Sequence, residues 1–76
     1  MELTYHLEIR GSLPRGTHEE LRRRFGDVVT HRDADLTVLS GLTVDQAALR
    51  AVLGLLWDVG GELHLLRVIT PAGHDD

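Results

Sequence analysis

The segment "VVTHRDADLTVLSG", residues 28–41, sets the topology that the sequence predicts. Its two ends are rich in β-branched and other apolar residues, and the polar run "RDAD" separates them. Two such runs joined by a short polar segment are typical of a β-hairpin. We expect a tight turn around Asp33 and Ala34, because an aspartate side chain can bond to the backbone two residues further on.

The same segment also brings a histidine, an arginine and two carboxylates together, from His31 to Asp35. The order His-Arg-Asp is similar to a kinase catalytic loop, but that loop needs an asparagine and the chain contains none. Asp33 and Asp35 are similar to the start of a calcium loop, but a strand-like run without further ligands follows them. The sequence therefore favours a turn over a catalytic or metal site.

The elements on either side of the hairpin complete the fold. Residues 3–10 alternate between apolar and polar side chains, which predicts a half-buried strand, and residues 62–70 predict a last strand. Residues 17–26 and 43–61 predict helices. The order β-α-β-β-α-β predicts an α+β, ferredoxin-like sandwich. We expect a four-stranded antiparallel sheet with both helices on one face and the first and third strands in the centre.

Both predicted helices begin with a capping-box pattern. Thr17 precedes Glu20 by three residues, and Thr43 precedes Gln46 by three residues. In such a box the threonine hydroxyl and the Glu or Gln side chain each accept a hydrogen bond from a backbone amide of the first turn. We therefore expect Thr17 and Thr43 to be the N-cap residues.

Length and composition limit the class of protein. The chain has 76 residues, which predicts a single domain over residues 1–70 followed by a polar tail, residues 71–76. It contains no cysteine, so disulfides, thiolate zinc sites and cysteine nucleophiles are excluded. The net charge of −4 argues against nucleic-acid binding. No apolar run reaches the ~20 residues that span a membrane, and no signal peptide is evident, so a cytoplasmic location is expected.

Several apolar residues fall where a water-facing surface is expected. On a helical wheel Leu53 and Trp57 lie opposite the apolar stripe of the second helix, and large exposed apolar patches usually mark interfaces. The open face of the sheet is also expected to be unusually apolar. We expect a homodimer, because a second copy is the commonest partner, with another protein as the alternative. The expected interface residues are Val28, Leu39, Leu53, Trp57, Leu66 and Val68.

Two further clusters have chemical potential. In "GSLPRGT", residues 11–17, a helix N-terminus beside an arginine can hold an anion, and the expected ligand-binding residues are Gly11, Arg15, Gly16 and Thr17. His6, His64 and Glu8 could share the open face and serve a small cofactorless enzyme or a metal. Simple cross-strand pairs, Glu8 with His64 and Arg10 with Glu62, are the alternative. No catalytic residue, metal ligand or cofactor is assigned.

The segment "LTVLSGLTVDQAALRAVLGLLWDVGGELHLLRVI", residues 36–69, resembles the C-terminal half of a family of small uncharacterised actinobacterial proteins. The helix-forming "VDQAAL" is the distinctive part of this resemblance, which implies a GC-rich bacterial source and no catalytic residues. The predicted topology is also distantly similar to ACT-type regulatory domains, which dimerise and bind small ligands near the turn after the first strand. We therefore expect a non-enzymatic homodimeric interaction or regulatory module, with a sensor of an anionic metabolite or amino acid as the alternative.

Overall fold

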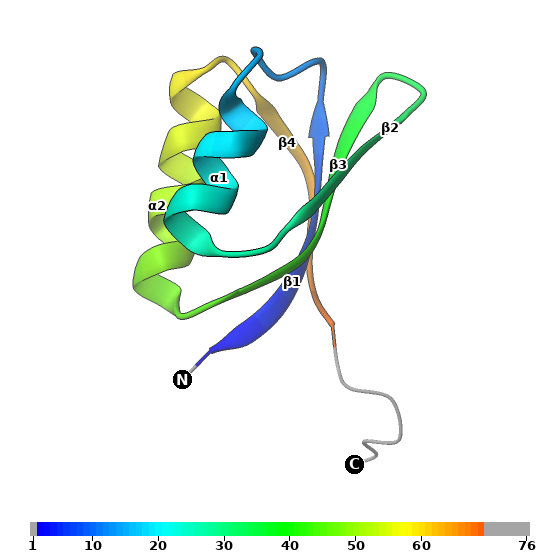
Figure 1. The fold of residues 1–76 in the computed structure, drawn as a ribbon. Helices are drawn as coiled ribbons and strands as arrows, with labels where there is room; N and C mark the ends of the chain where they lie inside the picture. Colours follow the sequence, from blue (N-terminus) through cyan, green and yellow to red (C-terminus); the bar gives the residue numbers. More distant parts are fainter. Residues whose placement is uncertain (1, 70–76) are drawn as a thin grey trace.

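The computed structural model describes residues 2–69, which form four strands and two helices (Figure 1). The predicted tail, residues 71–76, lies outside the described residues. The order β-α-β-β-α-β is the predicted one. In sequence the elements are β1 (Leu3–Arg10), α1 (Thr17–Phe25), β2 (Val29–Asp33), β3 (Leu36–Val44), α2 (Gln46–Asp58) and β4 (Glu62–Ile69).

The strands form one antiparallel sheet in the order β2-β3-β1-β4. Both helices pack on the same face of this sheet, and the other face is open (Figure 1). The central position of β1 and β3 confirms the prediction. Because β1 is bonded on both sides, its alternation fixes the two faces: Tyr5, Leu7 and Ile9 are buried under the helices, and the residues between them belong to the open face.

The core lies between the sheet and the helices. Each of its fully buried leucines stabilises the fold by roughly 1.5–3 kcal/mol through the hydrophobic effect. Val52 and Leu56 of α2 are also buried in this core. The core residues are Tyr5, Leu7, Ile9, Leu21, Val28, Leu39, Leu42, Val44, Val52 and Leu56.

The N-cap residues differ from the predicted ones. Helix α1 begins after Gly16, whose φ of 94° places it in the left-handed region, and none of the side chains in residues 2–69 caps the helix. Thr17 is instead the first helical residue and is buried. Thr43 still belongs to β3, where its hydroxyl lies 2.8 Å from that of Thr4, and Asp45 caps α2. The capping boxes are wrong because α1 enters through a glycine and because β3 continues to Val44.

The Asp45 cap gives a first testable expectation. Its Oδ1 accepts a hydrogen bond of 2.8 Å from the backbone N–H of Ala48, which α2 cannot satisfy internally. Asp45→Ala should therefore lower the free energy of unfolding by about 1 kcal/mol, measured by urea denaturation. Asp58→Ala, at the C-terminal end of the same helix, is the control and should cause no loss, because a carboxylate is unfavourable there. Equal losses in the two variants would contradict the assignment of Asp45.

The β2–β3 hairpin turns one residue later than predicted. Asp33 pairs with Leu36, so Ala34 and Asp35 form the turn, and Ala34 has a positive φ of 56°. The register then sets Leu39 opposite Leu7, on the face that the helices cover. The predicted placement of Val28 and Leu39 at an interface is therefore wrong, because both are buried in the core.

The last strand also shows a different face from the predicted one. A bulge in the pairing of β4 with β1 lies between the partners of Glu8 and Ile9, and it reverses the alternation beyond it. Leu66 and Val68 therefore pair with Leu7 and Tyr5 and lie on the helix side, not on the open face. They nevertheless stay 39% and 47% exposed, because they lie at the edge of the sheet.

The two α2 residues predicted at the interface behave differently. Leu53 is partly buried against the core, so its expected exposure is wrong. Trp57, one turn later, is 60% exposed, as expected. Leu49, Leu53 and Trp57 are four residues apart, and at about 100° per residue each step of four moves the side chain slightly further around the helix in the same direction. Because the connection from β3 through α2 to β4 is right-handed, this direction leads outward, along the flank of α2 away from α1. Figure 1 shows α1 covering the other flank.

Candidate functional site

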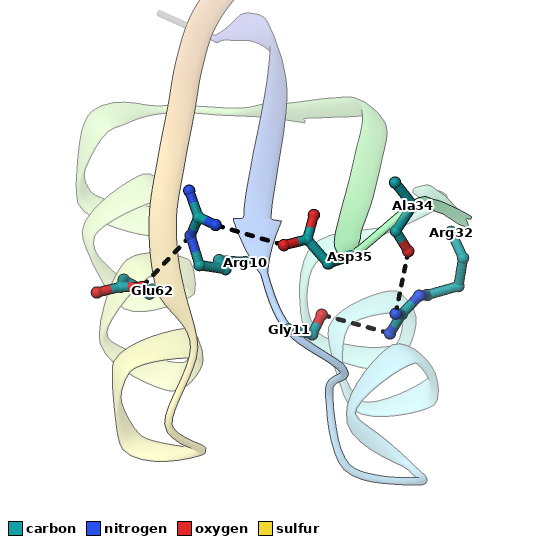
Figure 2. Close-up of polar contacts among 6 residues, drawn as sticks. All are labelled: Arg10, Gly11, Arg32, Ala34, Asp35 and Glu62. Carbon is teal, nitrogen blue, oxygen red and sulfur yellow. Dashed lines mark hydrogen bonds and ion pairs between the residues drawn. The ribbon is translucent and has the colours of Figure 1, made fainter.

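The loop between β1 and α1 is fixed to the end of the β2–β3 hairpin. The Gly11 amide donates to the carbonyl of Asp35 at 2.8 Å, and the Thr37 hydroxyl donates to the Gly11 carbonyl at 2.7 Å. Arg32 extends from β2 and donates to the carbonyls of Gly11 and Ala34 at 3.4 Å each (Figure 2). It also donates to the hydroxyl of Ser12. The loop therefore has a defined shape, in which Gly11 and Gly16 adopt left-handed backbone angles.

A hollow of about 310 Å³ lies between this loop, α1 and the hairpin. Of the predicted ligand-binding residues, Arg15 and Gly16 line it, whereas Gly11 and Thr17 do not. Arg32, His18 and Thr30 also line it, and sequence reasoning missed all three. Ser12 and Thr37 also line it, together with the apolar side chains of Leu13 and Pro14, and no carboxylate of the described residues does.

The two arginines of this hollow carry uncompensated charge. Among the described residues no carboxylate lies within 4.0 Å of Arg15 or Arg32, and the three contacts of Arg32 are to neutral oxygens. Arg10 on the neighbouring strand is different, because it contacts Asp35 at 3.3 Å and Glu62 at 3.6 Å (Figure 2). The hollow is therefore a local positive site on a chain of net charge −4.

Two buried polar atoms beside the hollow lack a hydrogen-bond partner within residues 2–69. They are Nε2 of His18, in the first turn of α1, and Oγ1 of Thr30, in β2. A second hollow of about 550 Å³ shares both residues and extends toward Arg22 and Ser40. Buried polar groups in proteins usually have a partner, so an unpaired hydroxyl and an unpaired imidazole nitrogen, on two residues that line the same two hollows, need an explanation.

The open face does not assemble the histidine cluster. Nε2 of His6 lies 3.0 Å from Oε2 of Glu8, but the β4 residues opposite them are Arg67 and Leu65. His64 lies at the bulge and is exposed, so the cross-strand pair of Glu8 with His64 is wrong. The predicted pair of Arg10 with Glu62 is confirmed. Across the described part of the chain, no group of three or more His, Asp or Glu side chains is arranged to hold a metal ion.

The "HRDAD" segment forms the hairpin turn, as predicted. His31, Arg32 and Asp33 end β2 and are exposed, and the two turn residues follow them. Antiparallel pairing with β3 sends these side chains alternately to the two faces of the sheet, so they do not converge on one point. Of these residues, Arg32 lines the hollow beside the β1–α1 loop.

The edge strand β4 is the second feature that a partner could use. We call the exposed apolar residues Trp57, Leu66 and Val68 the β4 edge patch. Natural proteins protect sheet edges with short strands and charged side chains. The opposite edge, β2, has five residues, "VTHRD", with charges at Arg32 and Asp33 and one exposed apolar residue, Val29, whereas β4 has eight, "ELHLLRVI", with charges only at Glu62 and Arg67. The two edges are therefore not equivalent.

Together these features define a small α+β sandwich domain. One edge of its sheet, β4, is apolar, and a positively charged hollow lies beside the other edge, β2. The chain belongs to a family described as a domain of unknown function, DUF8691, whose model matches residues 4–68. No curated protein and no solved structure shows significant similarity to the chain. No helix among residues 2–69 is long and apolar enough to cross a membrane.

Proposed function

We propose that this protein is a non-enzymatic interaction module that works as a homodimer, with a ferredoxin-like fold. The fold assignment is supported by the strand order β2-β3-β1-β4 together with the element order β-α-β-β-α-β. The functional assignment is supported by one observation above all. The β4 edge patch leaves apolar side chains in water beside a row of backbone groups that no other strand of the described chain pairs.

The patch combines two kinds of contact on one side of the molecule. The outer edge of β4 offers backbone N–H and C=O groups to another strand. Leu66 and Val68 lie on the helix side of that strand, and Trp57 extends from the flank of α2 that faces the same edge. A partner strand beside β4 would therefore bring its own helix against Trp57 and cover both kinds of group together.

A second copy of the chain fits this edge best. An antiparallel pair of β4 strands around a two-fold axis joins two sheets into one of eight strands, and it closes the assembly because each copy has one such edge. With the axis at Leu66, Leu66 of one copy lies opposite Leu66 of the other, and Leu65 of each copy lies opposite Arg67 of its partner. An axis at Arg67 would set two like charges opposite each other, which is unfavourable. Dimerisation also enlarges the small core of a 76-residue chain.

Size-exclusion chromatography with light scattering tests the dimer. At tens of micromolar the wild-type chain should show twice the 8.5 kDa of one copy. Leu66→Arg places two positive charges opposite each other at the axis and should raise the dimer dissociation constant at least tenfold. The matched control is Val29→Arg, an exposed residue of the other edge strand, which should leave the dimer unchanged. A wild-type monomer at these concentrations contradicts the proposal.

A cysteine variant tests the position of the axis separately. Because the chain has no cysteine, Leu66→Cys introduces a single thiol, and at a two-fold axis it should give a disulfide-linked dimer within minutes of mild oxidation. Val29→Cys should remain largely unlinked under the same conditions. A dimer by light scattering in which Leu66→Cys links no faster than Val29→Cys would retain the dimer and reject this edge as its interface.

A further inference from the structure

We propose that the hollow between the β1–α1 loop, α1 and β2 binds the phosphate group of a small phosphate monoester. This inference stands apart from the dimer, because the hollow and the β4 edge patch share no residue. The residues that carry it are Arg15, Arg32, His18 and Thr30, with the hydroxyls of Ser12 and Thr37 in the same wall.

The charge of the hollow fits a doubly charged anion. Arg15 and Arg32 supply two positive charges, and no carboxylate within the described chain lies close enough to neutralise either. Arg32 is held in place through neutral oxygens of the loop and of the hairpin turn, so its charge is positioned but not compensated. Guanidinium groups bind phosphate through paired N–H donors, and a phosphate monoester carries close to two negative charges at neutral pH.

The unpaired polar atoms fit the same ligand. A phosphate has three terminal oxygens that accept hydrogen bonds, and the hydroxyl of Thr30 and Nε2 of His18 can both act as donors. Both atoms have no partner among residues 2–69, although a buried polar group without a partner costs roughly 1–3 kcal/mol. Both atoms are covered in the unliganded structure, so a change of side-chain rotamer would bring each of them to an oxyanion in the hollow and give it a partner.

The size of the space favours a small metabolite over a macromolecule. The hollow between the loop, α1 and β2 has a volume of about 310 Å³, which is larger than a phosphate group, and the adjoining one, which shares His18 and Thr30, has about 550 Å³. Val28, Val29 and Ser40 line the second hollow, so it can take the carbon skeleton of the ester while the phosphate lies between the arginines. An acidic chain with only two free arginines here is poorly suited to a nucleic-acid backbone.

The test is a titration followed by ¹H–¹⁵N NMR at constant ionic strength, with inorganic phosphate as the probe and acetate as the singly charged comparison. We expect saturable shifts of the Gly16, His18 and Thr30 amides with phosphate and much smaller shifts with acetate. Arg15→Gln should weaken phosphate binding about tenfold or more, as expected for loss of a charged hydrogen bond. Arg50→Gln, an exposed arginine of α2 outside the hollow, is the matched control and should bind like the wild type.

Thr30→Val keeps the shape of the side chain and removes only the hydroxyl. It should weaken phosphate binding several-fold while leaving the unliganded fold as stable as before, or more so, because an unpaired polar atom has been removed. A merely structural role for Thr30 would instead lower stability and leave binding unchanged. Shifts that do not saturate, equal responses to acetate and phosphate, or equal binding by Arg15→Gln and Arg50→Gln would each overturn the proposal.

Discussion

Replacing Leu39 by alanine is expected to lower the free energy of unfolding by about 2–5 kcal/mol. Leu39 is 0% exposed, and its partner across the β1–β3 pair, Leu7, is equally buried, so the truncated side chain leaves a cavity that neighbouring strands cannot fill. A domain of this length has a total stability on the order of 4–11 kcal/mol. The loss is therefore a large share of the total, and urea denaturation followed by circular dichroism measures it directly.

Leu66→Ala is the matched comparison for Leu39→Ala. The same truncation at a residue that is 39% exposed at the sheet edge should cost less than about 1 kcal/mol in the monomer, and it should act mainly on the dimer. If Leu39→Ala instead weakened the dimer and left the unfolding of the monomer unchanged, Leu39 would face a partner. The register of β3 against β1 would then be wrong.

The faces of β3 and β4 are what the sequence could not predict. The elements follow from periodicity, because alternation in residues 3–10 and the apolar stripe of the second helix need no tertiary information. A shift of a strand by one residue, however, moves all its side chains to the opposite face. The pairing of β1 is irregular with both neighbours, between Tyr5 and Leu7 against β3 and between Glu8 and Ile9 against β4. These irregularities bury Leu39 and turn Leu66 to the helix side.

The candidate site was predicted only in part, for a related reason. Arg15 and Gly16 lie in one contiguous loop whose glycines and position before a helix are visible in the sequence. Thr30 and Arg32 reach the hollow because β2 pairs with β3 at one particular register, and His18 reaches it because α1 packs with one particular rotation. The signal that could have found Thr30 is its place two residues from Val28, on the buried side of the hairpin.

Gly61→Ala is expected to lower the free energy of unfolding by about 1–3 kcal/mol, since it inserts a methyl group into a filled space. A Cβ at this position would lie 2.9 Å from Cγ2 of Ile9 and 2.9 Å from the carbonyl oxygen of Leu56. The oxygen cannot move away freely, because it accepts a 2.8 Å hydrogen bond from the Gly61 amide. That bond and one from the Gly60 amide to the Trp57 carbonyl end α2 in a Schellman arrangement.

Gly54→Ala provides the control with the opposite sign. Gly54 lies within α2, is exposed, and has nothing within 4 Å of an added Cβ, so the substitution should raise stability by about 0.5–1 kcal/mol through helix propensity alone. Both variants add the same methyl group, so urea denaturation of the two separates the effect of close packing at residue 61 from the effect of helix propensity at residue 54. If Gly61→Ala were as stabilising as Gly54→Ala, the junction of α2 with β4 would be looser than its contacts indicate. The position of β4 along β1, and with it the direction in which Leu66 points, would then need revision.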